Sequence, residues 1–348
     1  MQSILFTSDI CQCLAQHCSN ANADRLFVLT DDITFKLCRK RLAACAPLQQ
    51  ATDICIGSTD SHKTLESLAQ VWTALSNGQA SRRSLLINVG GGMVTDLGGF
   101  AAATFKRGIR FVHIPTTLLA MVDAAVGGKT GINLNGLKNE VGCFAKSEAV
   151  IIDTSFLQTL DKPNLLSGYA EMLKHALLED HAMWVGHLQT DLQQPDYKHL
   201  QQLVKQSIHT KERIVSIDPH EHGIRKALNL GHTIGHALES LALRRNQPLL
   251  HGYAVAWGLV CELFLSSIYA GFPITEMRQT VQFIRSNYGT FDFTCKDYDY
   301  LYERMLHDKK NVGGIIHLTL LNAIGQVCLD QHLSREAIYE SFDFLREG

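Results

Sequence analysis

The sequence lacks the features that mark several large classes of protein. No C-x-x-C motif occurs among its ten cysteines, which argues against a thiolate zinc finger. Scattered cysteines in a chain of 348 residues also argue against a disulfide framework. The first residues show no basic and then apolar layout of a signal peptide, and no apolar run approaches a membrane-spanning length without a charge or a break. We therefore expect reduced thiols, a cytoplasmic location and no membrane partner.

An excess of charge of one sign is also missing. The 32 Lys and Arg residues nearly balance the 34 Asp and Glu residues, and the formal net charge is −2. No global basic field is present, so nucleic acid is not expected as a partner. The hydrophobic share of 46% is ordinary for a globular protein, and a chain of this length exceeds one average core. Two domains are therefore expected.

The two halves of the chain differ in their periodicity. Before residue 154, helical patterns alternate with short apolar runs that predict buried strands at 25–30, 53–56, 84–89, 111–115 and 149–153. Such alternation is typical of a mostly parallel α/β sheet. Helical periodicity dominates afterwards, except at 315–330, where two β-rich runs predict a hairpin. We predict an α/β domain over residues 1–154 and a helical domain over 155–348.

Polar residues recur in an otherwise apolar helical pattern of the second half. Arg225, Asn229, His232 and His236 are spaced 4, 3 and 4 apart, so one continuous helix would place them on one face. The residues between them are mostly Ala, Leu, Ile and Gly, which predicts a buried helix. Buried polar groups need partners, and a metal ion or an anionic ligand would supply them. The alternative is two hydrogen-bonded core histidines with an arginine that reaches solvent.

Three glycines, Gly90 to Gly92, stand between a predicted strand and a predicted helix. Glycines allow close approach of a ligand, and a helix N-terminus offers free N–H groups to phosphate. Asp96 would face the same ligand. The stretch is not G-x-G-x-x-G, so a tight strand–helix turn is the alternative. A P-loop at Val126–Thr130 is rejected, because Asp123 stands where that motif needs glycine.

Further charged residues could bind anions or a metal. Lys129, Lys138 and Asn139 could form an anion pocket with residues 105–108, or the lysines could simply be solvated. Glu171 and Lys174, three residues apart on a helix, could form a modest surface ion pair. Glu171, His232 and His251 together would instead give a two-nitrogen, one-carboxylate site with open positions, as in catalytic zinc enzymes, although the sequence does not show that they converge.

Eight motifs together resemble the 3-dehydroquinate synthase family over nearly the whole chain. They include G-G-G-M-V-T-D-L-G-G-F, V-G-G-K-T-G-I-N, A-E-M-L-K-H and R-K-A-L-N-L-G-H-T-I-G-H-A-L-E, and they lie at 90–100, 105–109, 115–133, 137–142, 170–175, 225–239, 251–258 and 308–311. The resemblance implies a Rossmann-like, NAD-binding N-terminal domain and an all-α C-terminal domain that binds metal and substrate, with the active site between them. It also implies a homodimer.

The resemblance implies a role for each matching residue. The zinc ligands would be Glu171, His232 and His251, with cobalt possible in place of zinc. The NAD-binding residues would be Asp60, Lys63, Gly91, Gly92, Asp96, Thr116, Thr117, Lys129, Lys138, Phe156 and Thr159. The catalytic residues would be Asp123, Lys174, Lys211, Asn229 and His236. The other substrate-binding residues would be Arg107, Lys129, Asn139, Arg225, Lys309 and Lys310, so Lys129 would contact both NAD and substrate. Asp60 stands where the family usually has Glu, so the adenosine-side contacts are less well defined.

The implied reaction converts a small sugar phosphate, 3-deoxy-D-arabino-heptulosonate 7-phosphate, to 3-dehydroquinate and phosphate. It proceeds through transient oxidation by NAD, elimination of phosphate, re-reduction and an intramolecular aldol closure. Three rival functions remain. They are another sugar phosphate cyclase such as an inosose or valiolone synthase, a metal-dependent alcohol dehydrogenase of the glycerol dehydrogenase type, and a catalytically idle NAD-binding regulator.

Overall fold

The computed structural model of the chain describes residues 2–135, 137–307 and 315–347. It forms two compact units, Met1–Asp161 and Lys162–Gly348. The sequence placed the boundary near residue 154. The short 3-10 helix that follows this point, η6 (Thr154–Thr159), belongs to the first compact unit.

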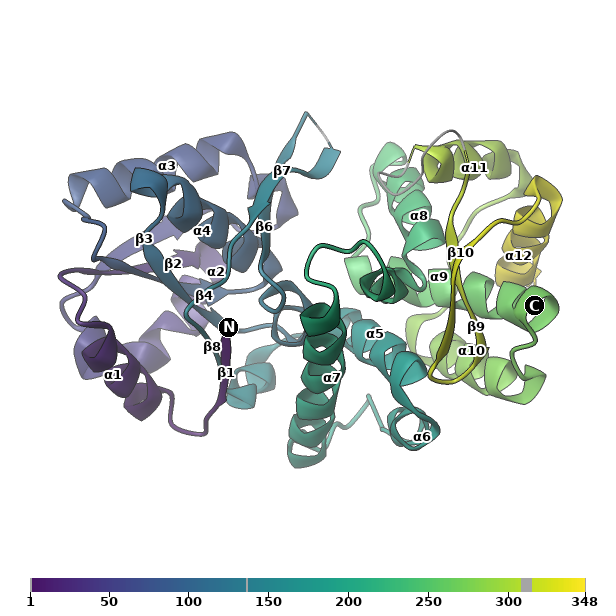
Figure 1. Cartoon of the computed structure of the whole chain (residues 1–348), viewed down its shortest axis with the longest axis horizontal. Helices are drawn as coiled ribbons and strands as arrows, with labels where there is room; N and C mark the ends of the chain where they lie inside the picture. Colours follow the sequence, from purple (N-terminus) through teal and green to yellow (C-terminus); the bar gives the residue numbers. More distant parts are fainter. Residues whose placement is uncertain (1, 136, 308–314, 348) are drawn as a thin grey trace. The chain divides into compact units, whose positions relative to one another are not determined.

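The first unit is built on a six-stranded sheet in which all strand pairs are parallel (Figure 1). The strand order is β1-β8-β5-β4-β2-β3, and a separate antiparallel hairpin pairs β6 with β7. The strands are β1 Ser3–Phe6, β2 Leu26–Asp31, β3 Thr52–Ile56, β4 Leu85–Gly90, β5 Arg110–Pro115, β6 Lys129–Leu134, β7 Leu137–Phe144 and β8 Ala149–Ile152. The predicted parallel α/β architecture is confirmed, and all five predicted strands are present.

Helices of the first unit cover this sheet. They are α1 Ile10–Ala21, α2 Asp32–Leu37, α3 Leu65–Asn77 and α4 Gly92–Thr104, with short turns η1 Arg39–Leu42, η2 Ala46–Leu48, η3 Asp60–His62, η4 Phe105–Arg107 and η5 Ala120–Ala124. Glycine allows α4 to lie close to β4, because a Cβ on Gly98 would come 2.1 Å from Oδ1 of Asn88. This contact fixes the start of α4 beside the end of β4, where the Gly90–Gly92 turn lies.

Three strands escaped the sequence analysis for physical reasons. β1 has only four residues, and none of them is fully buried. β6 and β7 form a hairpin, and most residues of β7 are exposed, so neither strand has the apolar run of a buried strand.

The second unit is largely helical, with one hairpin (Figure 1). Its helices are α5 Lys162–Glu179, α6 His181–Leu188, α7 Tyr197–Ile217, η7 Ile224–Asn229, α8 His232–Arg244, α9 His251–Leu265, η8 Ser266–Ala270, α10 Ile274–Tyr288, η9 Cys295–Asp297, α11 Tyr298–Leu306 and α12 Arg335–Glu347. The hairpin pairs β9 (Leu318–Ala323) with β10 (Gln326–Gln331), which confirms the strand pair predicted in 315–330.

Helix α9 is the central helix of this unit and packs on α8, α5, α12 and α10. Together with η8 it spans His251–Ala270, the single helix among the described residues that is long and apolar enough to cross a membrane. However, 67% of its apolar window is buried inside the protein, as expected of a helix in a folded core.

The prediction of a single helix is wrong for the segment that contains Arg225, Asn229, His232 and His236. Residues Ile224–Asn229 form the 3-10 helix η7, and Gly231 then adopts φ +79° before α8 begins at His232. Glycine tolerates this left-handed conformation, and its N–H donates to the buried carboxylate of Glu262 at 2.6 Å. The break redirects the chain, so Arg225 and Asn229 are positioned by a turn, while His232 and His236 are one helical turn apart on α8.

One cysteine expectation is also wrong. Cys11 in α1 and Cys45 before η2 form a disulfide, whereas the sequence analysis expected reduced thiols throughout. Their separation of 34 residues carries no motif spacing, so only the folded chain brings them together.

Three glycine contacts hold α9 against α5 and α8. A Cβ on Gly252 would lie 1.9 Å from the carbonyl oxygen of Ser167, and one on Gly258 would lie 1.9 Å from that of Gly231. A Cβ on Gly235 would lie 2.9 Å from the carbonyl oxygen of Ala254. Backbone atoms cannot move aside as a flexible side chain can, so these positions exclude larger residues.

We therefore expect Gly258→Ala to lower the free energy of unfolding by about 1–3 kcal/mol or more, because the added methyl group must push α8 away from α9. Gly186→Ala is the matched control, since a Cβ there would meet nothing within 4 Å. It should be neutral or stabilising by about 0.5–1 kcal/mol, because alanine favours a helix. Calorimetric unfolding of the two variants checks this. Equal stability of the two would contradict the packing argument.

Candidate functional site

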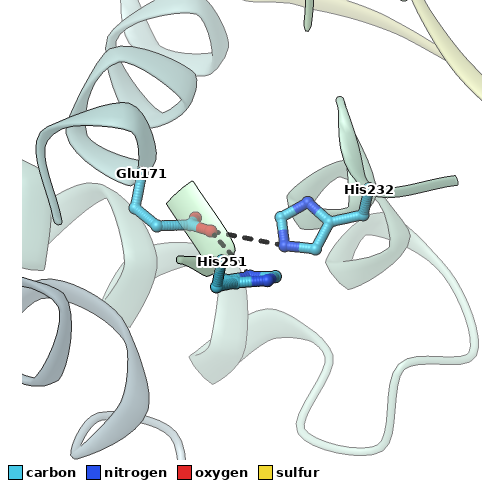
Figure 2. Close-up of side chains that lie close together, drawn as sticks. All are labelled: Glu171, His232 and His251. Carbon is cyan, nitrogen blue, oxygen red and sulfur yellow. Dashed lines mark ion pairs between the residues drawn. The ribbon is translucent and has the colours of Figure 1, made fainter. Parts of the chain in front are cut away.

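Three helices of the second unit bring Glu171, His232 and His251 together (Figure 2). Glu171 lies in the middle of α5, and the two histidines are the first residues of α8 and α9. Oε1 of Glu171 is 3.3 Å from Nε2 of His232 and 3.4 Å from Nε2 of His251. The two histidines follow Glu171 by 61 and 80 positions in the sequence, yet the three residues present ligand atoms within 4.8 Å of one another.

These residues fit a metal ion. Zinc binds histidine nitrogen and carboxylate oxygen at about 2.1 Å, so neighbouring ligands of a tetrahedral ion lie about 3.4 Å apart. The two measured spacings of 3.3 Å and 3.4 Å match that edge. The side chain of Glu171 is 0% exposed, and its buried Oε1 has no hydrogen-bond partner among the described residues. A cation on this side would satisfy it.

Each histidine is oriented through its other ring nitrogen. Nδ1 of His232 lies 3.1 Å from the carbonyl oxygen of Leu230 and is therefore the donor of that hydrogen bond. Nδ1 of His251 lies 3.5 Å from Oε1 of Glu239 in α8. In both cases Nε2 is left to face Glu171, as a metal ligand requires.

The charges of the cluster suit cation binding. Burial lowers the pKa of His232 to about 3, so this imidazole is neutral. Burial opposes the charge on Glu171, but Lys174 and His232 hold the pKa of its carboxyl well below the usual value. Burial would also lower the pKa of His251, but the carboxylates of Glu239 and Glu171 raise it to about 10. A metal takes neutral imidazole, so binding would displace a proton from His251.

Two predicted lysines are buried in the same unit. Lys174 is 1% exposed and its Nζ pairs with Oε2 of Glu171, so the alternative of a surface ion pair is wrong. Lys211 in α7 is 6% exposed, and α7 packs on α5. A buried ammonium group is costly unless it meets an anion, and Glu171 supplies that anion for Lys174.

Arg225 and Asn229 are held by the turn between α7 and α8. Oδ2 of Asp218 accepts from the backbone N–H groups of Gly223 and Arg225 at 2.7 Å and 3.1 Å. The Arg225 guanidinium donates to the carbonyl oxygen of Pro219 at 2.6 Å, and the Asn229 amide donates to Glu221 at 3.0 Å. Arg225 is 2% exposed, so the predicted possibility that it reaches solvent is wrong.

His236 lies one turn beyond His232 on α8. Its ring centroid is 5.5 Å from that of His232 and 6.0 Å from that of His251. It is not a member of the Glu171 cluster, but it belongs with Glu239 and His251 to a second group of potential ligand atoms. The structure therefore places His232 and His236 in different groups of potential ligand atoms, although their spacing alone presents them as equal candidates for a metal.

The glycine turn of the first unit is arranged as a phosphate site requires. β4 ends at Gly90, α4 begins at Gly92, and Gly91 lies between them with no side-chain cap on the helix. The chain leaving β5 lies beside it, because the Thr116 N–H donates to the Gly90 carbonyl at 3.0 Å and a Cβ on Gly91 would be 3.1 Å from Thr117. Free N–H groups of α4 are thus available at the carboxyl ends of two parallel strands.

Five predicted residues of the first unit form one polar cluster. Nζ of Lys63, which is 4% exposed, contacts Oδ2 of Asp96 at 2.6 Å and also Oδ1 of Asn139. Lys138 lies 3.9 Å from Asp60. Asn133, absent from the predicted site, joins the two pairs because its amide contacts Asp60 and accepts from the Asn139 N–H.

The remaining predicted residues are more dispersed. Lys129 is exposed at the start of β6, so it does not open a helix as the lysine of a P-loop does. Arg107 is exposed with φ +65°, and Asp123 lies on the π-helical turn η5. Phe156 is buried beneath Arg41, and Thr159 donates to its carbonyl oxygen. Lys309 and Lys310 lie outside the described residues.

Sequence reasoning missed Glu239 and Asp218. Glu239 had a detectable signal, because it lies seven residues after His232 and three after His236, on the same face of α8. Asp218 had none, since it acts through backbone N–H groups that only the folded turn presents.

Two solved sugar phosphate cyclases share this fold. The chain is similar to a 2-epi-5-epi-valiolone synthase from Streptomyces hygroscopicus with NAD+ and Zn2+ bound, with 24% identity, a TM-score of 0.87, and coverage of 100% of this chain and 97% of that chain. It is also similar to a 2-deoxy-scyllo-inosose synthase complexed with carbaglucose-6-phosphate, NAD+ and Co2+, with 22% identity, a TM-score of 0.85, and coverage of 99% and 96%. The fold is therefore that of the sugar phosphate cyclases.

Sequence comparison defines the family within this class. The 3-dehydroquinate synthase N-terminal family matches residues 53–167, and the 3-dehydroquinate synthase C-terminal family matches residues 168–311. A 3-dehydroquinate synthase from Parabacteroides distasonis is 52% identical over 347 residues, which cover 100% of this chain and 98% of the relative. The chain belongs to the 3-dehydroquinate synthase family. It has the activity of a phosphate-eliminating cyclase, the 3-dehydroquinate synthase that the family resemblance implied.

The two histidines of α8 provide a direct test of the metal cluster. We expect His232→Ala to lose stoichiometric zinc, because it removes one of three converging ligands, while His236→Ala retains zinc and loses turnover. Metal analysis of the purified variants after dialysis measures both. If His236→Ala lost zinc while His232→Ala kept it, the ion would instead belong to the second group, with Glu239 and His251.

Proposed function

We propose that this chain converts 3-deoxy-D-arabino-heptulosonate 7-phosphate to 3-dehydroquinate and phosphate with the residues described above. The single observation that carries the proposal is the cluster of Glu171, His232 and His251, whose ligand spacing suits a catalytic metal, in a chain of this family. Three protein ligands leave a position open for substrate oxygens, as in other catalytic zinc sites.

We assign two cofactors to separate parts of the chain. Glu171, His232 and His251 would hold zinc, or cobalt in its place. The N-terminal end of α4 with Gly91 and Gly92, the threonines Thr116 and Thr117, and the cluster around Lys63 would hold NAD. When bound, zinc would polarise a substrate carbinol and NAD would reversibly accept its hydride, so that oxidation, phosphate elimination, reduction and aldol closure occur without net redox change.

The protein residues would bind and orient the substrate. In the second unit, Lys211 and Arg225 would bind its carboxylate, because a buried guanidinium and a buried ammonium group are strong partners for an anion in a low-dielectric site. Asn229 and His236 would contact its phosphate, and Lys174 would keep Glu171 ionised through their contact. In the first unit, Lys129 and Asn139 would bind phosphate, and Asp123 would accept a hydrogen bond from a substrate hydroxyl.

Phosphate elimination needs a base near the substrate C–H. The substrate's own phosphate would serve, because the activating oxidation acidifies the neighbouring carbon and the proton then has only a short distance to move. The residues of the chain would position and polarise rather than abstract the proton. Lys309 or Lys310 would add a further phosphate contact, and Arg107 would complete the phosphate site from a neighbouring subunit in a homodimer. We assign the enzyme to the cytoplasm, where reduced thiols are the rule, because eight of its ten cysteines are free and only Cys11 and Cys45 form a disulfide.

The decisive assay measures phosphate release from the heptulosonate phosphate. We expect release to require NAD in catalytic amounts, with no NADH accumulating at steady state, and to fall to background after exhaustive chelation and return with zinc. Steady accumulation of NADH would indicate a dehydrogenase of the glycerol dehydrogenase type. Full activity after chelation would contradict the metal assignment.

Arg225 provides a test of substrate binding that leaves the metal intact. We expect Arg225→Ala to raise KM by roughly 10- to 100-fold, because a charge-assisted contact to the substrate carboxylate is lost. Zinc content should be unchanged. Arg213→Ala is the control, since this exposed arginine of α7 pairs with Glu179. An unchanged KM in Arg225→Ala would remove this residue from the substrate site.

A further inference from the structure

A buried carboxylate outside the proposed ligand set contacts one of the ligands. Glu239 is 8% exposed on α8, and its Oε1 lies 3.5 Å from Nδ1 of His251, the first residue of α9. The opposite nitrogen of the same ring, Nε2, lies 3.4 Å from Glu171. The imidazole of His251 therefore lies between two carboxylates, one on each nitrogen.

We infer that Glu239 is a positioning residue, which accepts the Nδ1 proton of His251 and thereby fixes the ring with Nε2 toward the metal. This inference rests on the metal site proposed above and adds a residue to it. Neutral imidazole carries its proton on one nitrogen only, so an acceptor at Nδ1 selects the tautomer whose Nε2 lone pair is free to bind metal. The separation of 3.5 Å is long for a hydrogen bond, and an approach of a few tenths of an ångström would close it.

The position of Glu239 on α8 supports this role. His232, the ligand at the start of α8, and Glu239 are seven residues apart, which is nearly two helical turns and places them on one face. One helix thus supplies a ligand and also orients the ligand of the neighbouring helix. His232 is oriented differently, by the carbonyl oxygen of Leu230 in its own chain segment. At His251, by contrast, the acceptor is a side chain of another helix.

A competing explanation makes Glu239 a ligand. Ligand atoms of His236, Glu239 and His251 also lie within 4.8 Å of one another. A metal there would need Nδ1 of His251, the nitrogen that faces Glu239. A ligand role in this group predicts either a second metal ion, which would raise the stoichiometry to two, or a displaced single ion, which His236→Ala would then lose.

The test measures zinc affinity and stoichiometry in the full-length enzyme by competition with a chromogenic chelator. We expect one zinc per chain throughout, with Kd raised about 10-fold in Glu239→Gln and about 100-fold in Glu239→Ala. The Gln variant keeps an oxygen acceptor but loses charge assistance, which explains the smaller effect. Glu303→Gln, an exposed carboxylate on α11, is the control and should match the wild type.

The outcomes separate this inference from the metal site itself. If wild-type enzyme binds no zinc, the proposed metal site is wrong. If the wild type binds one zinc and the Kd of Glu239→Gln stays within about twofold, only the positioning role is overturned. Two zinc ions in the wild type and one in Glu239→Gln would make Glu239 a ligand and also overturn it. In the cobalt-substituted enzyme, a shifted visible spectrum in Glu239→Gln at unchanged far-UV circular dichroism would report altered His251 geometry.

Discussion

The close packing of α9 against α5 and α8 is the constraint on which the metal cluster depends. Glycines at positions 252, 258 and 235 let backbone meet backbone, at distances where any Cβ would overlap a carbonyl group. The three helices that meet in this way are the three that carry Glu171, His232 and His251. Since ligand atoms must agree to within about half an ångström for a metal, the site needs rigid helices rather than loops to carry it.

Burial gives this cluster its chemical character. Glu171 and Lys174 are removed from water, and each stabilises the charge of the other. In such a place a cation adds favourable interaction with Glu171, and a neutral His232 is ready to bind it. Polar groups that would destabilise an ordinary core are held here by their mutual contacts, which is a common property of catalytic sites.

Much of the architecture could be predicted from the sequence, because buried parallel strands and amphipathic helices leave periodic apolar patterns. The parallel sheet of the first unit is an example. Three features could not be predicted in the same way. At the Gly231 break, the backbone N–H donates to Glu262 of α9, which lies 31 residues further along the sequence. The disulfide joins cysteines with no motif spacing. The β6–β7 hairpin has little buried apolar surface to reveal it. The convergence of Glu171 with His232 and His251 is likewise a tertiary property, although the family motifs allowed it to be predicted by resemblance.

The division of the site residues along the chain has a consequence for substitutions. All three proposed metal ligands, and Glu239 beside them, lie in the second compact unit, whereas the glycine turn and the Lys63 cluster lie in the first. Substitutions in the second unit can therefore change the proposed metal ligands without altering any residue of the glycine turn or of the Lys63 cluster.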